Sequence, residues 1–401
     1  MARRADVVIG SAFGDEGKGL VTDVLASGYV DDTVVVRFNG GAQAGHTVVT
    51  PEGQRHVFSH FGSGTFAGAA TFLSRFFVVN PILYHREREQ LERLGVSAQV
   101  FVDGRSNVTT PFDMFINTAL ERRRGSDRHG SCGVGFGETV GRNQNAAFAL
   151  TMADLARPDL EARLSSIRDR WFLQRLGGLG LNMSDAERAT LCSDALLARF
   201  RDDALAMLDT IRLGDESVLC GASHVVFEGA QGLLLDQEMG YFPYVTRSYT
   251  GLRNVAALVA GTGITSLDVH YVLRPYLTRH GAGPLPGELP NPPFPGVVDQ
   301  TNIPNDWQGS LRFALLDLDV LRSSIERDTR HCGLPTGIGL NRMIAITCLD
   351  QVTDEVRFLQ SGTEATARPD DFVLRCRNAT SANRVLTSRG PARCECCLTF
   401  Q

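Results

Sequence analysis

The chain has 401 residues, with 40 Lys+Arg against 45 Asp+Glu, a formal net charge of -5 and 43% hydrophobic residues. This is the composition of an ordinary globular protein, too acidic for a general nucleic-acid binder and without the ~20-residue apolar run of a membrane helix. Nine cysteines are too sparse for a disulfide scaffold and the start leaves no room for a signal peptide, so we expect a cytoplasmic protein.

The first predicted unit is a strand, a glycine loop and a helix. Residues 5–10 are short and β-branched, which predicts a buried parallel strand. The loop 14–19 follows, and then an apolar-periodic helix over 20–25. This order aims backbone N–H groups and a helix N-terminus at an anion. The loop is neither a Walker A nor a Rossmann fingerprint, because the first Walker glycine is missing and a glycine follows the lysine.

Three charged residues make this loop unusual. Lys18 is the single lysine among the 40 basic residues of the chain. Arginine replaces lysine freely on a solvated face, but not where a compact ammonium must fit beside a phosphate. Asp15 and Glu16 precede it, and phosphates repel a carboxylate unless it ligates Mg²⁺ or takes a proton. The loop therefore predicts a nucleotide site with acid–base or metal function.

The next units continue the alternation of strands and helices. Residues 33–38 predict a second strand, and a second glycine loop ends at His46, which suits proton transfer or phosphate contact, with a structural histidine as the alternative. Further strands are expected at 76–79, 99–102, 224–227, 269–273 and 343–348, and helices at about 84–94, 151–173, 184–211 and 311–327. We expect an α/β fold with a large, mostly parallel central sheet flanked by helices, with helical and loop insertions, in a single domain over 1–401.

Two later motifs carry polar groups at strand ends. The segment 227–236 is a strand that runs into a glycine turn, where Gln231 offers an amide to a base or carbonyl, with a plain turn as the alternative. The segment 347–350 follows an apolar strand and is similar to the guanine-reading motif of GTPases, whose aspartate accepts hydrogen bonds from guanine. The proline-rich segment 283–295 is expected to be a loop or lid.

Together these segments resemble the adenylosuccinate synthetase family, in order over essentially the whole chain. The motifs that carry the resemblance are 14–19, 35–47, 227–232, 241–246, 278–284, 347–350 and 388–391. The resemblance implies a P-loop-NTPase-like ligase fold that joins L-aspartate to C6 of a purine nucleoside monophosphate. A nucleoside triphosphate, ATP or GTP, first phosphorylates O6 with Mg²⁺ present, and the aspartate amine then displaces phosphate.

The resemblance also implies roles for individual residues. Asp15 is the expected base at purine N1 and a Mg²⁺ ligand with the Gly45 carbonyl, His46 the general acid, and Gln231 a partner of O6 and N1. The residues implied for the triphosphate are Gly14, Glu16, Gly17, Lys18, Gly19, Thr47, Asp350, Ser388, Gly390 and Pro391. Those implied for the purine monophosphate are Gln43, Ser131, Cys132, Arg142, Gln231 and Thr246. Arg312 is expected to bind aspartate, and Arg142 to reach the 5′-phosphate across a homodimer interface.

The departures from the family pattern cluster away from the phosphates. They fall around Gln43, Cys132 and Tyr249, at Arg312, which is left from an arginine-rich loop, and at Cys348, which replaces the lysine of the donor-base motif. Repacking there favours an acceptor with a 2-amino group, so the leading hypothesis is GMP or dGMP, as in the phage-type variant, which would work in a host cytoplasm. The alternatives are IMP, as in the ordinary enzyme, and a nucleotide-binding switch without ligase activity.

Overall fold

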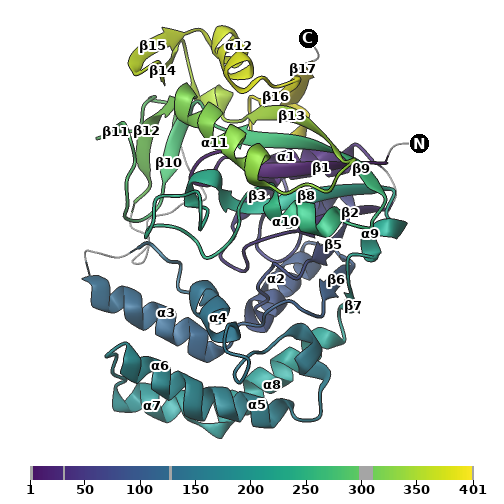
Figure 1. Cartoon of the computed structure of the whole chain (residues 1–401), viewed down its shortest axis with the longest axis vertical. Helices are drawn as coiled ribbons and strands as arrows, with labels where there is room; N and C mark the ends of the chain where they lie inside the picture. Colours follow the sequence, from purple (N-terminus) through teal and green to yellow (C-terminus); the bar gives the residue numbers. More distant parts are fainter. Residues whose placement is uncertain (1–2, 30–31, 126–128, 298–309, 400–401) are drawn as a thin grey trace.

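The computed structural model describes residues 3–29, 32–125, 129–297 and 310–399. At its centre is a ten-stranded sheet in the order β17-β16-β13-β9-β1-β8-β2-β5-β6-β7 (Figure 1). Its strands are β1 Arg3–Gly10, β2 Thr33–Arg37, β5 Ala70–Leu73, β6 Val100–Asp103, β7 Arg212–Gly214, β8 His224–Gly232, β9 Ile264–Leu273, β13 Gly339–Ile346, β16 Arg384–Ser388 and β17 Cys396–Thr399. Every neighbouring pair is parallel except β16–β17. This confirms the predicted fold class.

Both faces of the sheet are covered, as parallel sheets require. Side chains alternate along β1, so Val7 packs in the core that includes α10 (Leu252–Val259), α11 (Leu318–His331) and α12 (Pro369–Thr380). Val8 faces the opposite way, onto α1 (Lys18–Ser27). The central strand is therefore buried on both sides, in agreement with its continuous apolar sequence.

A group of helices lies beyond the β5–β6 end of the sheet, in the lower half of Figure 1. It consists of α3 Pro111–Arg124, α4 Phe136–Asn143, α5 Leu160–Ser166, a π-helical segment Ile167–Phe172, α6 Leu173–Gly178, α7 Asp185–Leu191 and α8 Asp194–Leu208. These helices share a second apolar core with α2 (Pro81–Arg93) and with Leu73, Val100 and Val102 of the sheet. They form the helical insertion that the sequence predicted between two parts of the sheet.

A smaller sheet was not predicted. Its order is β10-β12-β14-β15, with β10 Tyr276–Arg279, β12 Arg312–Asp317, β14 Val356–Gln360 and β15 Thr363–Ala367, and β11 Glu288–Leu289 pairs with β12. The helix expected from 311 was wrong over its first turns, because these residues pair with β10 and β11 instead. The helix begins only at Leu318, after Asp317 accepts hydrogen bonds from the amides of Asp319 and Val320.

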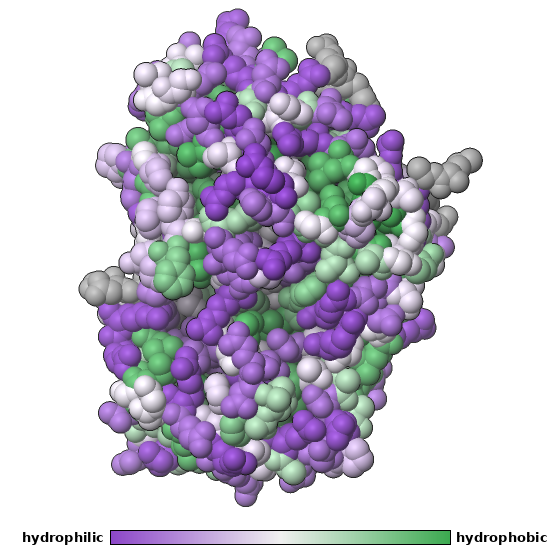
Figure 2. All heavy atoms as spheres, viewed as in Figure 1, coloured by the Kyte–Doolittle hydropathy of each residue, from purple (hydrophilic) through white to green (hydrophobic). Residues whose placement is uncertain are grey.

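Two other expectations differ from the structure. Residues 76–79 form no strand; Val78 and Val79 make only isolated bridges, to Gly41 and Val108. The long helices expected at 151–173 and 184–211 are each divided into shorter helices. Among the described residues, no helix combines the length and apolarity needed to cross a bilayer. Figure 2 shows a face dominated by hydrophilic side chains, with apolar ones in small groups.

The topology decides where polar loops gather. β1 lies between β8 and β9, so the chain passes from one side of β1 to the other between these two strands. In parallel sheets, ligands bind outside the carboxyl ends of the strands at such a switch point. The loops after β1, β2, β8, β9 and β13 all leave the sheet at that edge.

Candidate active site

The loop after β1 is fastened by its own glutamate. The Glu16 carboxylate is buried and accepts hydrogen bonds from the Ala12 and Gly14 amides, at 3.0 and 2.9 Å. Lys18 Nζ lies 2.8 Å from Glu16 Oε2, and both side chains are buried. The Thr347 hydroxyl donates to the Glu16 carbonyl at 2.7 Å, which fixes the loop to the end of β13. Glu16 therefore shapes the loop and holds Lys18. Its expected place at the triphosphate is supported through this loop, and not through a contact of its own carboxylate with phosphate.

Asp15 remains the available carboxylate of this loop. Its φ of 63° places it in the left-handed region, and its side chain is 24% exposed. His280 Nε2, just after β10, lies 3.5 Å from Asp15 Oδ2. Mg²⁺ prefers one or two carboxylates together with phosphate and water oxygens. Since Glu16 is occupied by loop amides and Lys18, Asp15 fits the donor set of such an ion, and the exposed Gly45 backbone agrees with the carbonyl expected beside it.

Close backbone approaches bring three glycine-rich loops together. A Cβ on Gly19, in α1, would lie 3.0 Å from His46 Cβ and 2.9 Å from the Thr47 carbonyl oxygen. A Cβ on Gly14 would lie 3.6 Å from Gln231 Cα. His46 and Thr47 begin β3 (His46–Val49), which pairs with β4 (Arg55–Phe58). The residues predicted as base, acid and amide therefore stand on loops in mutual contact.

The His46 ring is hydrogen-bonded to Glu228, a residue that the sequence analysis did not predict. Its Nδ1 lies 2.6 Å from Oε1 of Glu228, in the middle of β8. Burial lowers the pKa of His46, although Glu228 raises it. Burial raises the pKa of Glu228, but the charges of Arg37 and His46 bring it down to about 2. A carboxylate inside an otherwise apolar central strand was the sequence signal for Glu228.

Two amides offer unused hydrogen-bonding groups beside these loops. Both polar atoms of Gln43 and Oε1 of Gln231 are buried without a partner among the described residues. A Cβ on Gly40 would lie 3.6 Å from Gln231 Oε1 and 3.7 Å from Gln43 Nε2, so the amides converge on one point. Asn39 fixes the geometry, because its side chain exchanges hydrogen bonds with the Ala230 backbone at 2.7 and 3.0 Å. Buried amides without partners are typical of a polar ligand site.

The remaining residues predicted for the purine nucleotide lie on neighbouring loops. A Cβ on Gly130 would clash with Gly281, so the loop of Ser131 and Cys132 packs against the residue after His280. The Ser131 hydroxyl donates to Asn117 Oδ1 at 3.0 Å, and burial raises the pKa of the Cys132 thiol to about 11. Thr246 is half-buried, and its amide donates to the Leu235 carbonyl.

The residues predicted for the donor base follow β13 and β16. Asp350 is exposed on a 3₁₀ turn, Leu349–Gln351, that contacts β16. The Ser388 hydroxyl donates to the Gly390 carbonyl, and Pro391 is exposed. Because β13 and β16 are parallel neighbours, Asp350 and the segment from Ser388 to Pro391 both lie at the carboxyl ends of these strands.

Arg312 opens β12 at the rim of the same edge. It donates to the Gly281 and Gly283 carbonyls at 2.9 Å and pairs with Glu288. Its guanidinium therefore lies beside the loop that follows His280. Its own pKa is raised by the hydrogen bond to Glu288.

Arg142 does not occupy the place expected for it. Its side chain is fully buried, pairs with Asp113 at 2.9 Å, and donates to the Phe148 and Val108 carbonyls at 2.7 and 2.6 Å. A guanidinium whose nitrogens are all used inside its own chain is not free to reach a phosphate across an interface. Its role at a phosphate across an interface stays a prediction, and it would require these internal contacts to be exchanged.

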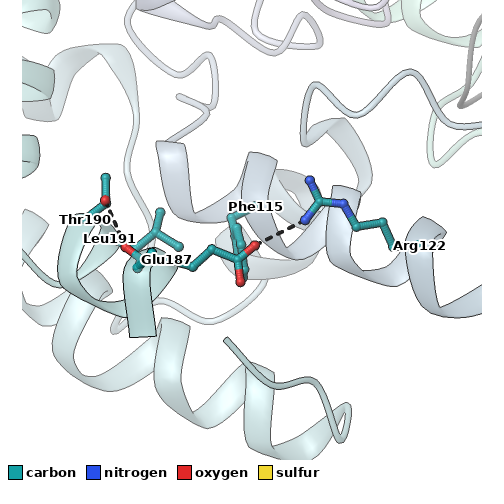
Figure 3. A pocket seen from close by; sticks show the side chains of 6 residues that line it. Phe115, Arg122, Glu187, Thr190 and Leu191 are labelled. Atoms are coloured by element: carbon teal, nitrogen blue, oxygen red, sulfur yellow. Dashed lines mark hydrogen bonds and ion pairs between the residues drawn. The ribbon is translucent and has the colours of Figure 1, made fainter. Parts of the chain in front are cut away.

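A surface hollow of about 370 Å³ lies elsewhere, between α3 and α7 (Figure 3). It is lined by Phe115, Arg122, Ala186, Glu187, Thr190 and Leu191. The Arg122–Glu187 ion pair crosses it, at 3.2 Å. None of the residues predicted for the site contributes to it, so the hollow belongs to the helical group.

Comparison with known proteins gives a consistent result. A family model described as adenylosuccinate synthetase matches residues 7–322. Adenylosuccinate synthetase of Thermosynechococcus vestitus is 34% identical over 290 residues, which cover 71% of this chain and 62% of that protein. The protein of the same name from Methylibium petroleiphilum is 32% identical over 353 residues, 86% of this chain and 74% of that one. The chain thus spans less than two thirds of the length of several relatives.

Two solved structures share the fold. Fully ligated adenylosuccinate synthetase from Plasmodium falciparum aligns with a TM-score of 0.76 at 18% identity, over 98% of this chain and 99% of that one. Succinoaminodeoxyadenylate synthetase (PurZ) of cyanophage S-2L, bound to dGMP and dATP, aligns with a TM-score of 0.58 at 16% identity, over 99% and 95%. Both support the architecture described above.

Proposed function

Because the chain belongs to the adenylosuccinate synthetase family, we propose that it is a ligase that joins L-aspartate to C6 of a purine nucleoside monophosphate at the expense of a nucleoside triphosphate. The observation that carries the proposal is the meeting of three loops. Asp15, His46 and Gln231 stand on backbone segments held in contact at Gly14 and Gly19. A base, an acid and an amide on adjoining loops are what activation of a purine O6 requires.

The chemistry follows from these groups. Asp15 takes the proton from purine N1, O6 attacks the terminal phosphoryl group, and the triphosphate leaves as its diphosphate. The aspartate amine then adds to C6 and phosphate departs with the O6 oxygen. Gln231 orients the purine edge, and His46 donates a hydrogen bond to the transferring phosphoryl oxygen.

The donor phosphates would meet Lys18 and the amides of the first loop. An ammonium has three donors, and Glu16 takes one of those on Lys18, so two stay available for phosphate oxygens. Mg²⁺, when bound, neutralises charge on these phosphates, and Asp15 and the Gly45 carbonyl are the oxygen donors proposed for it. Asp350 is proposed to read the donor base, which favours GTP over ATP. Arg312 is proposed to bind the carboxylates of aspartate, which would replace the Glu288 carboxylate on its Nε and Nη2.

For the acceptor, the relatives support IMP better than the guanylate expected first, because they are named as ordinary adenylosuccinate synthetases. GMP or dGMP is the second candidate, and Gln43 is the observation that favours it. Both of its polar atoms are buried without a partner among the described residues, so its oxygen is free to accept from a 2-amino group. Homodimerisation stays a prediction of the family resemblance.

The test is a substrate panel with the full chain. IMP, GMP and dGMP are each assayed with L-aspartate, Mg²⁺ and either GTP or ATP, and aspartate-dependent phosphate release is measured. Turnover of IMP is the expected result, and preferred turnover of GMP or dGMP would establish the second candidate. If no monophosphate supports aspartate-dependent release, the ligase proposal is overturned and the nucleotide-binding switch is favoured.

A further inference from the structure

The carboxylate of Glu288 occupies the part of Arg312 that a carboxylate ligand needs. Arg312 begins β12, and Glu288 begins the short strand β11 that pairs with it. Arg312 Nε donates to Glu288 Oε1 at 2.7 Å, and Arg312 Nη2 donates to Glu288 Oε2. This is the two-point geometry in which a guanidinium binds a free carboxylate. The edge of Arg312 best suited to an amino-acid carboxylate is therefore filled by a residue of the same chain.

The other donors of Arg312 offer no second place for a two-point contact. A guanidinium has five N–H donors. The two on Nη1 serve the Gly281 and Gly283 carbonyls, each at 2.9 Å, and two more serve Glu288. Among the contacts of the described residues, this leaves one N–H, on Nη2. A carboxylate that binds Arg312 at two points must consequently displace Glu288.

Glu288 is easily displaced. Its side chain is 42% exposed, so its carboxylate regains water as soon as it leaves the guanidinium. The hydrogen bond from Arg312 holds the pKa of this carboxyl below its usual range, so it is ionised at neutral pH. Arg312 stays in place during the exchange, because the Gly281 and Gly283 carbonyls hold it independently of Glu288. One carboxylate replaces another, and the charge of Arg312 remains compensated.

A second arginine gives this internal carboxylate a physical reason. Arg279 lies directly opposite Arg312 in the pairing of β10 with β12. Its side chain is buried and donates to the Pro284 and Tyr244 carbonyls, and no carboxylate pairs with it among the described residues. Burial and the charge of Arg312 lower the pKa of Arg279 to about 10. Like charges opposite each other destabilise a sheet, and the Glu288 carboxylate offsets this repulsion when no ligand is bound.

We propose that Glu288 is an internal competitor of the amino-acid substrate: its carboxylate rests on Arg312 until a carboxylate of L-aspartate takes its place. This inference rests on the proposed function of Arg312. A ligand whose site is only partly open binds more weakly, in proportion to the fraction that is open. An exposed ion pair favours the closed arrangement by about 1.5- to 5-fold, so Glu288 should raise the KM for L-aspartate by about 2- to 6-fold.

The experiment removes the competitor and keeps Arg312. Glu288→Gln is compared with the wild type in aspartate-dependent phosphate release by the full chain, with Mg²⁺, saturating triphosphate and the monophosphate that the substrate panel selects. KM for L-aspartate should fall by about 2- to 6-fold, whereas kcat and KM for the triphosphate should stay within about twofold. Loss of a merely structural residue would not lower this KM. Glu288→Ala should act in the same direction, which keeps the test decisive if one variant does not fold.

The chain offers a matched control in the smaller sheet. Glu364, on β15, pairs with Arg357, on β14, and Arg357 Nε lies 2.7 Å from Glu364 Oε1. Both side chains are exposed, so this pair resembles that of Glu288 in distance and in contact with water. Glu364→Gln should leave the KM for L-aspartate unchanged.

Arg312→Gln separates this inference from the proposed function. It should raise the KM for L-aspartate by about 10- to 100-fold, and adding Glu288→Gln to it should change that KM no further. If Arg312→Gln raises the KM but Glu288→Gln and Glu288→Ala leave it unchanged or raise it, the competitor is overturned and the proposed ligase stands. An unchanged KM in Arg312→Gln would overturn the proposed role of Arg312 and the competitor with it, while absence of turnover in the wild type would overturn the proposed function itself.

Discussion

Two buried glutamates, Glu87 and Glu228, each contact histidine rings in this molecule. The two clusters differ in the polar groups around them that have no hydrogen-bond partner. Around Glu87 both ring nitrogens of His60 are used: Nδ1 lies 3.5 Å from the carboxylate, and Nε2 accepts from the Asn80 amide at 3.1 Å. His56 Nε2 lies 3.7 Å from the same carboxylate and has no hydrogen-bond partner among the described residues. Around Glu228 the same chemistry stays open, because His46 uses only Nδ1 among the described residues. The first cluster lies outside the proposed site, and the second is the one proposed to present a group to a ligand.

The electrostatics of the two clusters are otherwise alike. Burial raises the pKa of both carboxyls, but neighbouring histidines and hydrogen-bond donors, with Arg37 at Glu228, lower both well below the usual range. A perturbed pKa alone therefore does not distinguish a structural glutamate from a functional one. The neighbouring unpaired amides of Gln43 and Gln231 make that distinction.

The strongest test of this comparison is to remove one histidine from each cluster. His46→Gln should lower kcat by about 10²- to 10⁴-fold, because it removes the group proposed to act in the transfer, and should also lower the thermal midpoint, because Glu228 loses a buried partner. His60→Gln should leave kcat nearly unchanged and lower stability by about 1–3 kcal/mol, because the Asn80 amide and Glu87 lose a buried partner. Steady-state assays and thermal unfolding of both variants check the contrast; exchanged phenotypes would refute it.

Lys18 sharpens the comparison. It is paired with the buried Glu16, and it lies in the loop that packs against His46. Lys18→Arg should lower kcat/KM for the triphosphate by about 10- to 100-fold. A guanidinium is larger and planar, and cannot keep the 2.8 Å contact to Glu16 while pointing compact donors at phosphate. Arg88→Lys, in a surface ion pair with Glu92, is the control and should be silent. Equal activities of the two variants would mean that the single lysine is an accident of composition.

A third buried carboxyl, that of Asp328, shows how burial changes a pKa when no cation is among its causes. Burial raises the pKa of Asp328 to about 7, although it accepts from the Leu252 amide and the Tyr271 hydroxyl, each at 2.8 Å. The folded chain thus holds this proton more tightly than the unfolded chain. The stability it contributes is complete below the unfolded pKa, near 4, and is lost as the pH rises through 7, by at most about 4 kcal/mol.

Asp328→Asn should flatten this pH dependence. The difference in thermal midpoint between pH 5.5 and pH 8 is expected to be smaller in the variant than in the wild type. Glu326→Gln changes an exposed carboxyl on the same helix and should keep the wild-type profile. A wild-type chain that is more stable at pH 8 than at pH 5.5, with the variant unchanged, would show that Asp328 is ionised in the folded state.

The sequence predicted elements that depend on neighbouring residues, and missed those that depend on residues far away in the chain. The first strand, its glycine loop and the helix after it were predicted because their pattern is local: apolar residues, then glycines, then helical periodicity. The segment from Arg312 to Asp317 failed because its strand character comes from pairing with β10 and β11, far away in the sequence. Tertiary pairing overrides local propensity in such segments.

The same limit applied to the site. Residues with an unusual local setting, such as Lys18 and His46, could be found by reading the chain. Glu228 was missed: a carboxylate in an apolar strand is a local signal, but its contact is with a histidine 182 positions earlier. The internal partner of Arg142 could not be read from the chain either: its motif matched, but Asp113, 29 residues before it, pairs with it in the single chain.

Gly19 has a consequence for any attempt to redesign this protein. With no side chain there, the first helix and the start of β3 touch backbone to backbone, so the spacing between the ammonium and the imidazole is a property of two rigid elements rather than of flexible side chains. Enlarging that position would displace His46 from Lys18 as a unit, whereas changes at Gln43 would leave that spacing untouched. The proposed acceptor preference would therefore be adjustable separately from the groups proposed for phosphoryl transfer.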